Sequence, residues 1–252
     1  MAPAVLITGG AKRIGGELSR RFAAAGWHLV IHAGHSPEAA YALAATLPSA
    51  EVVQCDLLDG AAALTLIEDL AGRLDDWRML INCAAVFNLD DAAAIDHGVF
   101  VEAMIVNAET PTRMAQAYLA KAKATGGRRV IQFLDQKLLN PNPDFFSYTM
   151  AKHAFAAGVK MLAMAQEHAE DRIYGLAPGA MLPSFDQADS EHEKSGRMNL
   201  LHRLTDPAEL AEAALFLSQG SLATGETLYV DSGQHLLAQQ RDVLYLARGK
   251  EA

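Results

Sequence analysis

The sequence predicts one α/β domain spanning residues 1–252, in which a doubly wound parallel sheet of about seven strands carries helices on both faces. Short runs of aliphatic and β-branched residues alternate with longer Ala-rich stretches, as strands and helices do in such folds. The strand-like runs are apolar on both faces, which is typical of a parallel sheet covered on each side. No linker rich in Pro, Ser or Gly divides the chain, so a single core is expected.

Each predicted strand is a short apolar run bounded by polar residues, Gly or Pro. The first run begins almost at once, with Ala4-Val5-Leu6-Ile7, and the last precedes Asp231-Ser232-Gly233. The strands are expected at Val5–Ile7, Leu29–Ala33, Glu51–Cys55, Met79–Asn82, Val130–Phe133, Ile173–Ala177 and Thr227–Val230.

Helices are expected where apolar residues recur with a period near 3.6. In the first of them, Leu18, Phe22 and Ala25 share one face. The helices are expected near residues 14–25, 37–46, 59–73, 98–124, 146–169 and 207–218.

Two segments interrupt this alternation. Residues 136–146 are rich in Asn and Pro and predict a loop after the fifth strand. Residues 180–206 contain Ser, Asp, Glu, His and Lys with little periodicity. Because long loops at the carboxyl ends of strands frame ligands in such folds, we expect 180–206 to be a mobile substrate lid. The alternative is a disordered surface insertion.

Composition excludes several classes of partner. The formal charge of −9 and the pI near 5.4 argue against a nucleic-acid or anionic-membrane surface. No apolar stretch approaches the length of a membrane span, and no targeting signal precedes the first strand, so a cytoplasmic protein is expected. No cluster of His, Cys and carboxylates has metal-ligand spacing, so no metal is expected.

A glycine-rich sequence, Thr8-Gly9-Gly10-Ala11-Lys12-Arg13-Ile14-Gly15-Gly16, joins the first strand to the first helix. Glycines in this position let the backbone approach a pyrophosphate, which the helix N-terminus stabilises. The sequence therefore predicts a dinucleotide-binding loop.

A Tyr/Lys pair indicates the chemistry. Tyr148 and Lys152 are four residues apart, so they lie on one face of a helix. The ammonium is expected to lower the pKa of the phenol, which could then give or take a proton beside a carbon that receives hydride. Asp135 lies thirteen residues ahead of Tyr148.

Together these features resemble the short-chain dehydrogenase/reductase family over essentially the full chain, and the resemblance implies a Rossmann fold. Further residues that match the family are Asp56, Asn82-Cys83-Ala84, Asn107 and Pro178-Gly179. By this resemblance the cofactor contacts are Gly9, Arg13, Ile14, His35, Ser36, Asp56, Leu57, Asn82, Ala84, Tyr148, Lys152, Pro178 and Gly179.

The residues favour NADP(H) over NAD(H). An NAD enzyme would carry Asp or Glu at the end of the second strand to hold the ribose 2′-hydroxyl, and this chain has His32-Ala33-Gly34-His35-Ser36 there. The Arg13 guanidinium suits a phosphate, and Ser36 can donate to a 2′-phosphate.

Within the family, the chain resembles the pteridine reductase and dihydromonapterin reductase-like branch. Most members have a serine where this chain has Asp135, and an ionised carboxylate cannot donate as a serine does. Arg13 resembles an arginine that touches cofactor phosphate and pterin, and Phe87 an aromatic residue that stacks on the pterin. The implied substrate-binding residues are Arg13, Phe87, Asp135 and Tyr148. Cys83, Ala85-Val86 and His35 depart from the branch.

The sequence thus predicts NADPH-dependent reduction of a pterin-like heterocycle, from dihydropterin to tetrahydropterin. In the implied catalytic set, Tyr148 supplies the proton, Asp135 positions ring and tyrosine, Lys152 holds the nicotinamide ribose, and Asn107 supports Lys152 through water. One alternative is a generic carbonyl reductase acting on ketones or acyl thioesters, and another is a non-catalytic NADP-binding regulatory protein.

The resemblance also implies a homotetramer, in which helices 98–124 and 146–169 pack between subunits. The tail, residues 234–252, carries apolar leucines whose role the sequence leaves open.

Overall fold

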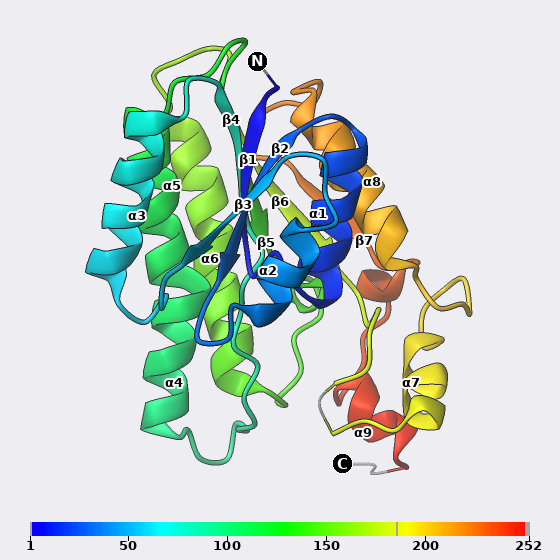
Figure 1. Cartoon of the computed structure of the whole chain (residues 1–252). Helices are drawn as coiled ribbons and strands as arrows, with labels where there is room; N and C mark the ends of the chain where they lie inside the picture. The colour runs from blue at the N-terminus through cyan, green and yellow to red at the C-terminus, as the bar shows by residue number, and fades with distance from the viewer. Residues whose placement is uncertain (1, 185, 250–252) are drawn as a thin grey trace.

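Seven parallel strands form the central sheet of the computed structural model, which describes residues 2–184 and 186–249 (Figure 1). Every strand-to-strand pairing is parallel, and the predicted strands are confirmed to within two residues at each end. The strands are β1 Ala4–Thr8, β2 His28–Ala33, β3 Ala50–Gln54, β4 Trp77–Asn82, β5 Arg129–Phe133, β6 Arg172–Pro178 and β7 Thr227–Val230.

The strand order is β3-β2-β1-β4-β5-β6-β7, so the chain changes direction across the sheet between β1 and β4. Loops that leave the carboxyl ends of these two neighbours run to opposite sides, which opens a crevice where such folds bind ligands. In Figure 1 these carboxyl ends point downward.

Two apolar cores cover the two faces of the sheet. One contains Leu6, Leu80 and Val130 and is completed by α3, α5 and α6. The other contains Ile7, Ile31 and Ile81 and is completed by α1 and α8. The flanking helices are α1 Arg13–Ala24, α2 Glu38–Ala44, α3 Gly60–Arg73, α4 His97–Met104, α5 Thr110–Lys121, α6 Phe146–Ala165 and α8 Pro207–Ser218.

The predicted helix 98–124 is helical from His97 to Lys121, but it is not α-helical throughout. A π-helical turn, η1 Ile105–Glu109, separates α4 from α5. Pro111 at the start of α5 has no N–H to donate to the preceding turn, which favours such a break. Widened turns of this kind recur at functional sites, and η1 contains Asn107.

Two helices lie where none was predicted. α7, Asp189–Gly196, falls inside the presumed lid, and α9, Val243–Ala247, falls inside the tail. They lie side by side below the carboxyl ends of the strands (Figure 1). Two short 3₁₀ turns, η2 Gln136–Leu138 and η3 Gln234–Leu236, also approach each other there.

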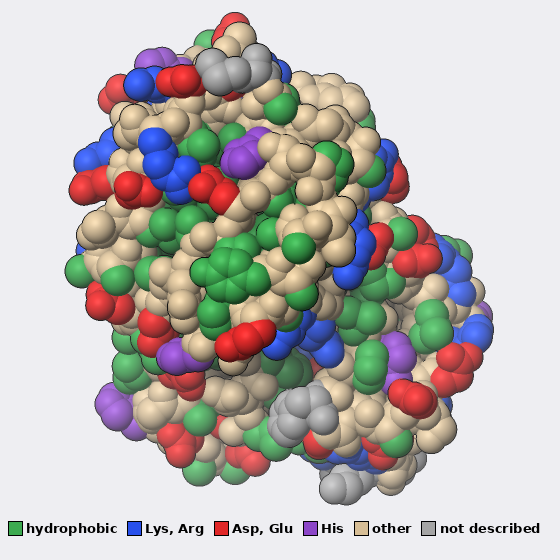
Figure 2. Space-filling model, in the orientation of Figure 1, with side chains coloured by type: hydrophobic (Ala, Val, Ile, Leu, Met, Phe, Trp, Pro, Cys, Tyr) green, Lys and Arg blue, Asp and Glu red, His purple; other side chains and the backbone are tan. Residues whose placement is uncertain are grey.

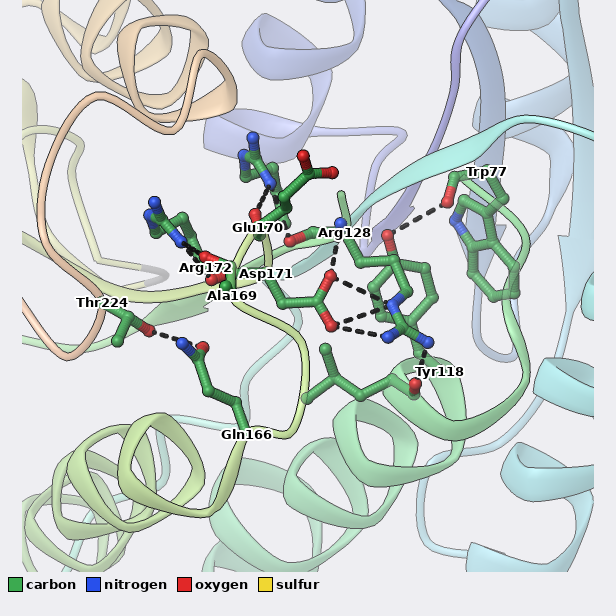
Figure 3. Close-up of polar contacts among 11 residues, drawn as sticks. Trp77, Tyr118, Arg128, Gln166, Ala169, Glu170, Asp171, Arg172 and Thr224 are labelled. Carbon is green, nitrogen blue, oxygen red and sulfur yellow. Dashed lines mark hydrogen bonds and ion pairs between the residues drawn. The ribbon is translucent and has the colours of Figure 1, made fainter. Parts of the chain in front are cut away.

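The opposite end of the sheet is fastened by a polar network (Figure 3). The Asp171 carboxylate accepts hydrogen bonds from the Arg128 side chain, at 2.6–3.1 Å, and from the Arg128 backbone N–H at 2.8 Å. Asp171 is buried and the Arg128 side chain is only 12% exposed, and Arg128 also donates to the backbone carbonyl of Leu119. This network ties the start of β5 to the start of β6 and to α5, away from the crevice.

Within the described ranges, no helix is long and apolar enough to cross a membrane.

Candidate functional site

A cavity of about 590 Å³ opens at the carboxyl ends of the strands. Its walls come from the loops that follow β1, β4, β5 and β6 and from the C-terminal segment. Figure 2 shows a hollow on this side of the molecule, between the main body and the lobe that carries α7 and α9. The cavity therefore lies at the crevice that the strand order creates.

The loop after β1 requires its glycines. Gly9 has a positive φ of 63°, and a Cβ there would lie 3.2 Å from the Cα of Ala84. A Cβ on Gly15 would lie 2.1 Å from the Gly9 carbonyl oxygen, closer than any side chain permits. His32 also holds this loop, because its Nδ1 accepts a hydrogen bond from the Gly9 N–H at 3.2 Å. The loop is thus tightly folded, with its backbone against the cavity.

Arg13 holds an unusual position in this loop. Its φ is 51°, in the left-handed region that favours glycine. Its guanidinium donates to the Pro183 carbonyl oxygen at 2.8 Å and so joins the glycine-rich loop to segment 180–206 across the cavity mouth.

Tyr148 and Asp135 meet inside the cavity. The phenol of Tyr148, near the start of α6, donates to Oδ2 of Asp135 at 2.8 Å. Oδ1 of Asp135 accepts the Lys137 backbone N–H at 2.9 Å, which fixes the carboxylate at the start of η2. Desolvation raises the pKa of the Asp135 carboxyl above its ordinary value.

The expected lowering of the Tyr148 pKa was wrong. Burial and then the adjacent Asp135 carboxylate raise the pKa of Tyr148 well above its ordinary value. Lys152 does not oppose this, because its ammonium donates to the Phe133 carbonyl at 2.6 Å and lies 5.6 Å from the tyrosine ring centroid. Burial also lowers the pKa of Lys152 to about 8. Tyr148 is therefore a neutral phenol, a proton donor, near neutral pH.

Asn107 contacts the loop after β4. Its side-chain amide donates to the Val86 carbonyl at 2.9 Å and accepts the Val86 N–H at 2.8 Å. This pair of bonds holds the chain immediately before Phe87. The ring of Phe87 stacks on Phe145, with centroids 4.0 Å apart, and meets Tyr148 edge to face at 4.6 Å.

Several predicted cofactor contacts lie away from the cavity lining. The Asn82 side chain turns into the core, where it donates to Pro111 and Gln132. Leu57 is buried in the core that also contains α3. His35 and Ser36 are exposed after β2, and His35 lies 3.3 Å from the Asp56 carboxylate. The predicted residues that the structure brings together around the cavity are Gly9, Arg13, Ile14, Ala84, Phe87, Asp135, Tyr148, Lys152, Pro178 and Gly179.

Other residues of the cavity were not predicted from the sequence. Lys137 follows Asp135 by two positions, which is its only signal in the sequence. Asp242, Val243 and Leu244 come from the tail and carry no motif. Cys83, Ala85 and Leu134 are further examples, whereas Lys12 lies in the predicted dinucleotide-binding loop and Met181 and Leu182 lie in the segment predicted as a lid.

The fold and the site define an α/β protein with a glycine-rich loop and a Tyr/Asp/Lys set at one cavity. The family model described as enoyl-(acyl carrier protein) reductase matches residues 9–235. The chain therefore belongs to this family of short-chain dehydrogenase/reductases, an oxidoreductase family.

Curated relatives cover nearly the whole chain. A putative ketoacyl reductase 2 of the granaticin polyketide synthase from Streptomyces violaceoruber is 29% identical, covering 94% of this chain and 97% of that protein. Pteridine reductase 1 from Leishmania tarentolae is 24% identical, covering 93% of this chain and 97% of that protein.

Among solved structures, FolM alternative dihydrofolate reductase 1 from Brucella canis, complexed with NADP, is similar. It has a TM-score of 0.87 and 29% identity, covering 95% of this chain and 96% of that one. The Brucella suis protein of the same name, also with NADP, matches equally well, with a TM-score of 0.87.

Proposed function

We propose that this chain is an NADPH-dependent reductase of a pterin-like heterocycle, converting a dihydropterin to a tetrahydropterin. The observation that carries the proposal is the hydrogen bond from the Tyr148 phenol to Asp135, at the position where most of the family has a serine. A carboxylate cannot donate to a substrate carbonyl, whereas it can hold a phenol that protonates a ring nitrogen. The pteridine and dihydrofolate reductases among the similar proteins support this choice.

The residues present fit a dinucleotide phosphate. The Gly9–Gly15 loop lies against the cavity, where its glycines let the backbone come close, and it leads into the N-terminus of α1. Arg13 and Lys12 add positive charge at the same place. Ser36 and His35 would contact the 2′-phosphate, and Asp56, Leu57 and Asn82 are the other proposed cofactor contacts. When bound, NADPH supplies the hydride.

Asp135 and Tyr148 act together in the proposed reaction. Burial raises the pKa of both groups, so the phenol of Tyr148 keeps its proton near neutral pH. Tyr148 gives its proton to the substrate nitrogen beside the carbon that receives hydride. Asp135 holds the phenol in line, and after the transfer it can take a proton from solvent and pass it to the phenolate.

Lys152 holds the nicotinamide ribose in this proposal. Its ammonium already donates to Phe133, which leaves further N–H groups for the ribose hydroxyls. Asn107 acts on the opposite wall, where it fixes the backbone before Phe87, and it supports Lys152 through water.

Phe87 and Arg13 complete the substrate site. Phe145 covers one face of the Phe87 ring, so a substrate ring that stacks on Phe87 uses the other face. Arg13 reaches the substrate and the cofactor phosphate from the cavity mouth. Segment 180–206, joined to Arg13 at Pro183, acts as the lid.

The direct test is to mix purified protein, NADPH and a dihydropterin and to follow the nicotinamide absorbance band. We expect NADPH consumption with formation of tetrahydropterin, and slower or no consumption of NADH. Absence of consumption with every dihydropterin and with dihydrofolate would overturn the proposal. Tight NADPH binding without turnover would point instead to a regulatory NADP-binding protein.

A second candidate is a carbonyl reductase, favoured by the similarity to the polyketide ketoacyl reductase. The variant Asp135→Ser separates the two, because a serine hydroxyl can donate to a carbonyl. In a pterin reductase the substitution lowers kcat/KM by about 100-fold, the scale of general acid catalysis. In a carbonyl reductase the same variant raises the rate with ketones.

We further propose that the protein is cytoplasmic and assembles as a homotetramer through α4, α5 and α6.

A further inference from the structure

The C-terminal segment, residues 241–248, forms one wall of the cavity beside Tyr148. Asp242, Val243 and Leu244 line the cavity, and Leu244 packs in a small cluster with Tyr148 and Phe145. Asp242 also lies close enough for its charge to contribute to the raised pKa of Tyr148. This wall is therefore at the end of the cavity where the proposed proton transfer takes place.

Lys137 crosses from the opposite wall to this segment. Its ammonium lies 2.7 Å from Oδ2 of Asp242 and donates to the Asp144 carbonyl at 3.2 Å. The two charged side chains are only 5% and 13% exposed, yet both line the cavity. Enclosing an ion pair has a desolvation cost that its attraction often fails to offset, so the pair contributes little net stability. The proposed proton transfer does not use it either.

The pair has hydrogen-bonding capacity left over. An ammonium has three N–H groups, and Lys137 directs two of them at Asp242 and Asp144. In Asp242, Oδ1 accepts the Leu244 N–H at 3.0 Å and Oδ2 accepts Lys137, while each oxygen has a second lone pair. A donor and an acceptor thus stand next to each other on the cavity wall.

We propose that Lys137 and Asp242 form the subsite that recognises the polar edge of the substrate ring. The matching chemistry is an edge with adjacent acceptor and donor, such as the oxo group and N–H of an amino-oxo pyrimidine ring. Lys137 donates to the oxo oxygen, and Asp242 accepts from the neighbouring N–H or amino group. This subsite rests on the proposed function, since it orients the same ring that Tyr148 protonates.

The 3₁₀ turn η2 fixes the spacing between recognition and chemistry. Oδ1 of Asp135 accepts the backbone N–H of Lys137, while Oδ2 accepts the Tyr148 phenol. The Asp135 carboxylate therefore positions both Lys137, which binds the ring edge, and Tyr148, which supplies the proton. A ring bound by Lys137 and Asp242 is placed at a set distance from the phenol.

Arg241 provides a matched control, because it anchors the same segment from outside the cavity. It makes a two-pronged ion pair with Asp144, at 2.8–3.0 Å, and its guanidinium lies 4.8 Å from the Tyr245 ring centroid. Arg241→Gln loosens the segment and leaves the charges of the cavity wall in place. If Lys137 only holds this segment in place, then substituting Lys137 should change ligand binding in the same way as Arg241→Gln does.

The test is calorimetric titration of protein saturated with NADP⁺ with two ligands, methylpterin and the corresponding methylpteridine without amino and oxo groups. The wild-type protein is expected to bind methylpterin at least about tenfold more tightly, the scale of one hydrogen bond to a charged group. Lys137→Met should weaken methylpterin binding by about tenfold and leave methylpteridine binding within about twofold. Asp242→Asn keeps the side-chain shape and should show the same selective loss.

The outcomes separate the subsite from the reaction. Equal loss of both ligands in Lys137→Met, or the same pattern in Arg241→Gln, would overturn the subsite. The subsite is also overturned if the wild-type protein binds the two ligands equally well. Selective loss in a protein that does not consume NADPH with dihydropterin would keep the subsite and overturn the proposed reaction.

Discussion

At the scale of single residues, the environment of a titratable group decides what it can do. Tyr148 and Lys152 are both buried, so each favours its neutral form, and the pKa of Lys152 is lowered to about 8. Asp135 then adds to the raised pKa of Tyr148. The sequence suggested that the Lys152 cation turns Tyr148 into a phenolate. In the structure, Tyr148 is a neutral phenol that is hydrogen-bonded to the Asp135 carboxylate.

The Lys152 pKa gives a prediction for the pH dependence of the reaction. Below a pKa of about 8 the side chain is an ammonium, and above it the charge that would hold the ribose is lost. We therefore expect kcat/KM, which reports on the free enzyme, to fall above about pH 8. Lys152→Arg keeps its charge and should move this basic limb to higher pH, although the maximum rate falls. If kcat/KM of Lys152→Arg fell at the same pH as that of the unaltered protein, the titrating group would not be Lys152.

At the scale of secondary-structure elements, the two ends of the sheet serve different purposes. The carboxyl ends carry the cavity, with the left-handed Arg13 and the tightly packed glycines. The amino ends carry the Arg128–Asp171 pair, which joins two neighbouring strands (Figure 3).

Removing one partner of this pair should be costly. Asp171→Ala leaves the Arg128 guanidinium buried without its carboxylate, so we expect unfolding free energy to fall by about 3–5 kcal/mol. Glu68→Ala, which breaks the exposed Glu68–Lys121 pair, is the control and should change it by at most about 1 kcal/mol. Denaturant titration measures both. Equal changes in the two variants would contradict a special role for the buried pair.

The inner strands were predictable because burial on both faces makes each an apolar run, as in Leu29–Ala33. The glycine-rich loop and the Tyr148–Lys152 spacing were predictable because their geometry is local. α7 was not, since its sequence is polar and it is held by packing against α9, far away in the chain. The direction of Lys152, toward Phe133, depends on tertiary structure in the same way.

At the scale of the whole molecule, exposed methionines mark one face. Met161 and Met164, three residues apart on one face of α6, are 63% and 87% exposed. Grouped apolar side chains on a surface are typical of subunit interfaces. This face is the one that the proposed tetramer would cover.

Light scattering tests the assembly. We expect the mass of four chains of 27.0 kDa each. The double variant Met161→Glu/Met164→Glu should give a smaller species, because it would place charges in an apolar interface. Tyr41→Glu is the control, because the Tyr41 side chain on α2 is also exposed, and it should leave the mass unchanged. A single-chain mass for the unaltered protein would refute the tetramer.

The walls of the cavity also differ in how they depend on the sheet. β7, the last strand, ends at Val230. Asp242 and Leu244, which line the cavity beside Tyr148, come after it in the chain. A proteolytic cut between these two points would therefore leave every strand in place and remove one wall of the cavity.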